Sequence, residues 1–87
     1  MDNYTTLANL LQAQKDLSGT IGTLRGTQSA SLEQSKQTNL YSKAERLSHY
    51  KEYLYIMSVE IPAIERHWRL IDGDIRRQFP TYSRHQG

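Results

Sequence analysis

The chain has no cysteine, only two prolines and no long apolar run, and each shortage narrows what it can be. Without cysteine it forms neither a disulfide framework nor a thiolate metal site. No stretch approaches the roughly 20 apolar residues that a membrane-spanning helix needs. The polar start Met1-Asp2-Asn3 lacks the basic and apolar regions of a cleaved signal peptide, so none is expected. None of these shortages tells where the protein works.

The length and composition favour one small, polar, ordered domain. A chain of 87 residues buries roughly 60 to 65% of its unfolded surface, which leaves little room for a catalytic cleft. Hydrophobic residues make up 37% and charged residues 23%, with both signs well mixed, as in an ordered helical protein rather than a disordered one.

Catalytic and metal-binding patterns are missing from the sequence. There is no His-Glu-x-x-His pattern, no nucleophile elbow and no glycine-rich phosphate loop. His49 and His67 are too far apart along one helix to share a metal. Asp72 and Asp74 are two residues apart, so on a helix they point about 200° apart. We therefore predict no enzyme activity, no cofactor and no metal site.

The strongest pattern is a heptad repeat between Leu40 and Phe79. Six of six a positions and four of six d positions are apolar. A period of 3.5 held over this length is typical of a helix that lays one narrow stripe against other helices. The predicted assembly interface consists of Leu47, Tyr50, Leu54, Met57, Ile61, Ile64, Trp68, Ile71, Ile75 and Phe79.

Pro62 interrupts this long segment. Proline in a helix interior costs about 3 kcal/mol, so two helices could meet here. The heptad register, however, continues across Pro62 without a skipped or added residue. That continuity favours a kinked but continuous helix, which ends near Phe79 because Pro80 disfavours helical geometry at the residue before it.

The first part of the chain predicts a shorter amphipathic helix over residues 1–25. Gly19 and Gly22 weaken it, so either the helix frays after Leu17 or the glycines let a neighbouring backbone come close. Residues 26–39 are rich in Ser, Thr and Gln, and form a flexible linker or a polar helix exposed on all sides. Capping-box spacings at Ser31 and Ser42 give two possible starts for the long helix.

These segments together predict an all-α helical hairpin with coiled-coil-like packing. A helix over residues 40–79 is roughly 60 Å long, whereas the apolar stripe from Leu7 to Leu24 spans roughly 27 Å. The first helix would then leave about half of the long seam bare. We expect copies of the chain or other helical subunits to cover it, which predicts a structural subunit of a larger assembly such as a filament, virion or secretion apparatus.

The C-terminal segment, residues 80–87 with the preceding arginines, is basic. Arg76, Arg77 and Arg84 carry charge with no acidic residue after Ile75. The alternative function is therefore a small regulatory binding module whose tail contacts nucleic acid or an acidic protein. The same arginines also fit a solvated helix end, where cations favour the negative end of the helix dipole.

Two stretches resemble the C-terminal helix of type III secretion system needle and inner-rod subunits. They are Leu47-Ser48-His49-Tyr50-Lys51-Glu52-Tyr53 and Ile71-Asp72-Gly73-Asp74-Ile75-Arg76-Arg77-Gln78-Phe79. The similarity, to a Tyr-x-x-Tyr region followed by an Ile-Asp-x-x-Ile-x-x-x-Phe-like end, covers less than half of the chain. The resemblance implies helical hairpins that stack into a hollow filament and are exported through its channel without a cleaved signal.

Overall fold

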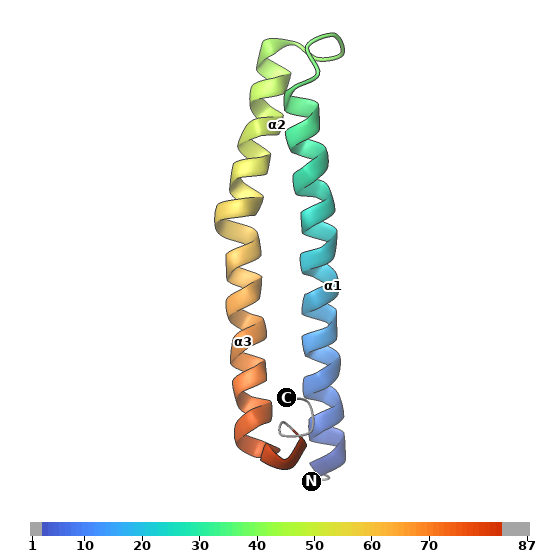
Figure 1. Cartoon of the computed structure of the whole chain (residues 1–87), viewed down its shortest axis with the longest axis vertical. Helices are drawn as coiled ribbons and strands as arrows, with labels where there is room; N and C mark the ends of the chain where they lie inside the picture. The colour runs from blue at the N-terminus through green and yellow to red at the C-terminus, as the bar shows by residue number, and fades with distance from the viewer. Residues whose placement is uncertain (1–2, 83–87) are drawn as a thin grey trace.

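Two antiparallel helical arms joined by a turn make up the protein (Figure 1). The computed structural model describes residues 3–82, with side chains from residue 5 onward. The first arm is α1 (Asn3–Ser35), and the second runs through α2 (Lys43–Tyr55), the π-helical segment η1 (Ile56–Glu60) and α3 (Ile61–Gln78). All regular secondary structure in residues 3–82 is helical, so the predicted all-α helical hairpin is confirmed.

The hairpin is a thin rod with a narrow apolar seam. Its extents are 57 × 24 × 16 Å, and its radius of gyration of 18.3 Å exceeds the about 12 Å expected of a compact domain of this length. The buried apolar side chains of the described residues all come from the second arm and are Ile56, Ile61, Ile71 and Ile75. Two helices enclose little volume between them, so most other apolar side chains keep part of their surface in water.

The first arm is longer than predicted. Residues 26–35, expected to be a linker, continue α1, and the segment is not exposed on all sides because Ser31 is only 2% exposed. Both ideas about the glycines were wrong. The helix does not fray after Leu17, and a Cβ at Gly19 or Gly22 would meet nothing within 4 Å.

Threonine side chains of α1 meet their own hydrogen-bonding needs on the helix backbone. The hydroxyls of Thr20, Thr23 and Thr27 donate to the carbonyl oxygens four residues before them, at 3.0 to 3.2 Å. The small side chain of Ser31 is buried where the two arms lie against each other. A polar composition alone does not reveal such a contact.

The second arm begins at a capping box on Ser42. The Ser42 hydroxyl accepts from the Glu45 amide at 3.2 Å, and the Ser42 amide donates to Glu45 Oε1 at 3.0 Å. The bond that the Ser42 amide donates to the carboxylate stabilises its charged form and is the main cause that lowers the pKa of Glu45. Of the two predicted helix starts, the structure selects this one. Leu40 lies in the turn, 73% exposed, and takes no part in the seam.

Pro62 neither breaks the second arm nor leaves its register intact. The amide of Ile61 donates to the Ile56 carbonyl oxygen five residues earlier, so the turn just before Pro62 is wider than an α-turn. Pro62 then sits in the first turn of α3, where its missing amide hydrogen is tolerated. The helix continues, as predicted, but the extra residue rotates the two sides of η1 by about 100° relative to one another.

The two arms match in length. The first holds 33 residues, and the segments of the second hold 13, 5 and 18. Figure 1 shows α1 running alongside the whole second arm. The sequence argument that a short first helix leaves half of the seam bare was therefore wrong, although part of the seam is exposed for another reason.

Candidate assembly surface

The π-helical segment divides the predicted assembly interface into two differently oriented parts. After η1, Ile61, Ile71 and Ile75 are 6%, 8% and 3% exposed. Ile64, Trp68 and Phe79 are half-buried beside them. This part of the predicted interface is occupied by packing within the hairpin.

The part before η1 faces solvent. Leu47, Tyr50, Leu54 and Met57, which we call the apolar row, are 52%, 43%, 38% and 43% exposed. Their spacing of three and four residues places them along one side of the helix. The structure therefore does not bring the two halves of the predicted interface onto one face.

A more polar row takes the inward positions in α2. Arg46, His49 and Tyr53 are half-buried and Ile56 is 2% exposed, and each precedes a member of the apolar row by one residue. The sequence did not indicate these four residues as inward-facing, because the apolar row has more apolar residues at heptad spacing than they do. Pro62 is the feature of the sequence that could have indicated the inward row. A π-turn with one extra residue just before a proline is one way to accommodate that proline in a helix.

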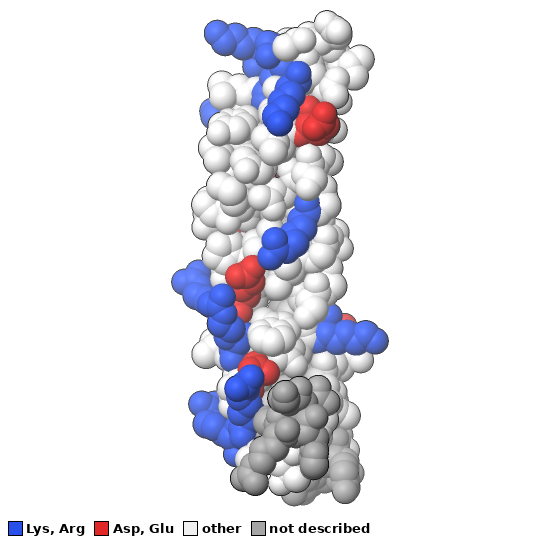
Figure 2. Space-filling model, viewed as in Figure 1, with Lys and Arg blue, Asp and Glu red and all other residues white. Residues whose placement is uncertain are grey.

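Cations without carboxylate partners surround the apolar row. The four ion pairs found in the described part of the chain all involve the acids Glu65, Asp72 and Asp74 of α3. Lys43, Arg46 and Lys51 take part in none of them. Figure 2 shows the same division, with Lys and Arg predominating at the turn end and both signs alternating along the lower half of the second arm.

A hollow of about 260 Å³ lies at the end of the apolar row nearest the turn. Ser35, Lys43, Arg46, Leu47 and Tyr50 line it. The Nε of Arg46 is buried, and no acceptor in the described residues bonds to it. A cationic, partly apolar hollow of this composition suits a carboxylate attached to an apolar surface.

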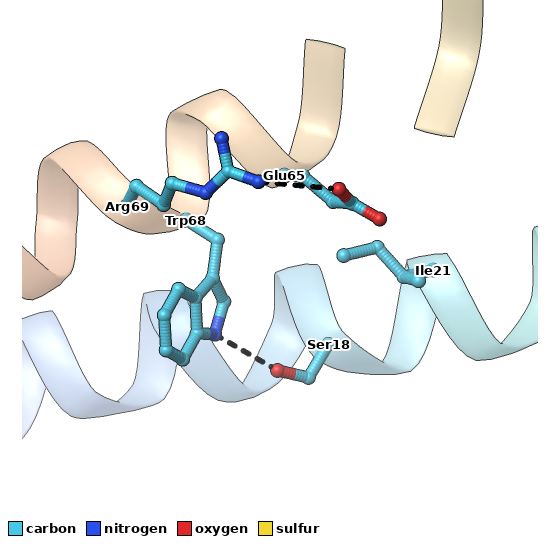
Figure 3. A pocket seen from close by; sticks show the side chains of 5 residues that line it. All are labelled: Ser18, Ile21, Glu65, Trp68 and Arg69. Carbon is cyan, nitrogen blue, oxygen red and sulfur yellow. Dashed lines mark hydrogen bonds and ion pairs between the residues drawn. The ribbon is translucent and has the colours of Figure 1, made fainter. Parts of the chain in front are cut away.

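A second hollow, of about 230 Å³, lies between the arms and is shown in Figure 3. The Trp68 indole donates to the Ser18 hydroxyl at 3.0 Å across the arms. Glu65 pairs with Arg25 of α1 at 3.3 Å and with Arg69 at 3.5 Å. The polar groups here satisfy one another, so these contacts hold the hairpin together.

The basic C-terminal segment is less available than the sequence indicated. Arg76 pairs with Asp72 at 2.9 Å, and Arg77 pairs with Asp74. Each carboxylate lies four or three residues before its arginine on the same helix. Both acids precede Ile75, so the absence of acidic residues after Ile75 did not reveal these pairs. Arg84 lies outside the described residues.

Other candidate sites are sparse. Across residues 3–82, no group of three or more His, Asp or Glu side chains is placed to hold a metal ion. No described helix combines the length and the apolar character needed to cross a membrane. Comparison with protein-family models, curated proteins and solved structures finds no match to this chain. The exposed apolar row is therefore the most distinctive surface of the molecule.

Proposed function

We propose that this chain is a structural subunit that packs by its apolar row against other helical proteins in a larger assembly. One observation carries the proposal. In α2 the more polar row, with Arg46 and His49, lies on the inward side, while Leu47 and Leu54 are exposed, as is Met57 in the adjoining η1. A chain that folded only for its own stability would bury the leucines and expose the arginine.

The free energy available from covering the row is substantial. Fully burying one such side chain contributes about 1.5 to 3 kcal/mol, and each member of the row is already about half covered. Burying the rest of all four therefore contributes about 3 to 6 kcal/mol before the entropic cost of association.

The surface area supports the same proposal. The chain exposes 6469 Å², compared with the about 5300 Å² expected of a compact protein of this mass. The excess of about 1200 Å² is larger than the about 800 Å² that each partner contributes to a standard protein interface. The excess is therefore enough for one standard contact.

The proposal is tested with two leucine-to-aspartate substitutions, one in the apolar row and one outside it. When no other helical protein is present, copies of the chain should cover one another's apolar rows, so light scattering of the purified chain over a concentration series should show masses above the monomer. Leu54→Asp should return the mass to the monomer, because the aspartate carboxylate would have to be desolvated in the contact. Leu70→Asp, at a residue of α3 that is 69% exposed, is the control and should leave the assembled mass unchanged.

Two outcomes contradict the proposal: assembly that survives Leu54→Asp, or assembly that both substitutions abolish equally. Ile64 and Trp68, which also belong to the predicted assembly interface, do not suit this test because they are half-buried parts of the hairpin seam. An aspartate at either position would unfold the hairpin and would not isolate a contact between subunits.

The kind of assembly is a further part of the proposal. The resemblance to type III secretion needle and inner-rod subunits favours a helical filament, and Tyr50 of that resemblance belongs to the exposed row. Negative-stain electron microscopy of the concentrated chain would distinguish filaments from closed oligomers.

A further inference from the structure

The hollow beside the apolar row combines charge with an unpaired donor. It is lined by two cations, Lys43 and Arg46, and by the hydroxyl-bearing Ser35 and Tyr50. No carboxylate is among its lining residues, and neither cation forms an ion pair with any described residue. The buried Nε of Arg46 has no acceptor. Leaving such a group unsatisfied is costly, so native structures rarely do it without a reason.

From this geometry we infer that the hollow is a binding site for a carboxylate on an amphipathic helix of a different protein. The inference rests on the proposed function, because the apolar side chains of that helix would cover the apolar row. Leu47 and Tyr50 line the hollow and also begin the row, so one helix can reach both surfaces. The Arg46 guanidinium pairs with the entering carboxylate, and a small rotation of its side chain lets Nε share in a two-pronged contact.

The charges favour a different protein over a second copy. The acids of α3 are already paired with arginines of this chain and Glu45 caps α2, whereas Glu33, Glu52 and Glu60 form no ion pair in the described residues. The case against a second copy therefore rests on the cations that it would bring. A second copy would bring its own unpaired Lys43 and Arg46 to the contact. A partner with Asp or Glu next to an apolar helix face neutralises these cations without opening an existing ion pair.

The test uses designed helical peptides as probes. Each of two 15-residue peptides presents four leucines at helical spacing with one glutamate, placed before the leucines in one peptide and after them in the other. Matched peptides carry glutamine in its place. The signal of the Arg46 Nε–H in a ¹H–¹⁵N spectrum of the full chain reports entry into the hollow, and isothermal titration calorimetry, which also serves the variants without Arg46, gives each dissociation constant.

One glutamate peptide should bind at least about tenfold more tightly than its glutamine match, since a hydrogen bond to a charged group is worth that much or more. Arg46→Met keeps the apolar stem and should abolish the difference. Lys51→Met removes a cation that does not line the hollow and is the matched control, for which the difference should persist.

The outcomes separate this inference from the proposed function. Equal binding of the glutamate and glutamine peptides, with both lost in Leu54→Asp, would overturn the carboxylate site and keep the apolar row as a contact. No binding by any peptide would also overturn the site, whereas the light-scattering test of the row would stand on its own. Peptide-free self-association that depends on Arg46 would identify a second copy as the occupant and overturn the choice of a different protein.

Discussion

The wide turn before Pro62 holds one residue more than an α-turn, and removing one residue tests its link to the proline. Deleting Val59, which is 46% exposed, converts η1 to an α-turn in which Ile56 lies four residues before Ile61 instead of five. Ile56 therefore keeps its orientation relative to Ile61, and α2 keeps the same side towards α1. We expect the stability to depend on which residue occupies position 62.

The magnitude follows from the proline. The same side chains of α2 lie inward before and after the deletion, so the buried apolar area stays about the same. With Pro62 retained, its ring clashes with the carbonyl four residues earlier in the new α-helix, at a cost of about 3 kcal/mol.

The assay is a double-mutant cycle in thermal and urea unfolding. Pro62→Ala should change the free energy of unfolding by less than about 1 kcal/mol in the natural chain, because the wide turn already accommodates proline. In the Val59 deletion the same substitution should restore about 3 kcal/mol, and the doubly changed chain should melt close to the natural one. Equal effects of Pro62→Ala in both backgrounds would refute the link between the proline and the register.

Two further predictions concern the seam and the cap. Ile75→Ala, at a residue that is 3% exposed, should lower the stability by about 2 kcal/mol or more, whereas Leu70→Ala at 69% exposure should change it by less than about 0.5 kcal/mol. Comparable losses in both variants would show that α3 is not oriented as described. Glu45→Gln should lower the melting temperature at neutral pH. The pKa of Glu45 is lower in the folded chain than the ordinary value of 4.5, so the carboxylate stabilises the fold above that pH. The stabilisation is lost as the pH falls through the folded-state pKa, and the two melting temperatures should then converge. A difference that persists unchanged into strong acid would contradict this account.

The sequence predicted the hairpin because its two apolar stripes are separated by polar residues, and period and composition are local properties. It did not decide the length of α1, since the polar composition of residues 26–35 fitted a linker as well as a helix, and the burial of Ser31 against the second arm is not visible in composition. It also assigned the wrong face to α2. The register shifts by one residue at η1, just before Pro62. A heptad count assigns the same rotation to every residue and therefore cannot show such a shift.

The candidate site was predicted in part for the same reason. The apolar row was identified residue by residue, but its exposure was attributed to a short first helix. The cations beside the apolar row have no partner because Glu65, Asp72 and Asp74 pair with other arginines. Which charges are neutralised depends on side-chain contacts that no count along the chain supplies.

Because the seam is thin, binding at the apolar row should change the stability of other parts of the rod. Gly19, Gly22 and Gly26 lie in open surroundings on α1, so that stretch is held mainly by its inner side and its amides should exchange with solvent readily. A protein that clamps α2 against α1 would slow this exchange several turns away from the point of contact. Amide protection along the glycine-rich stretch would then report occupancy at the far end of the molecule.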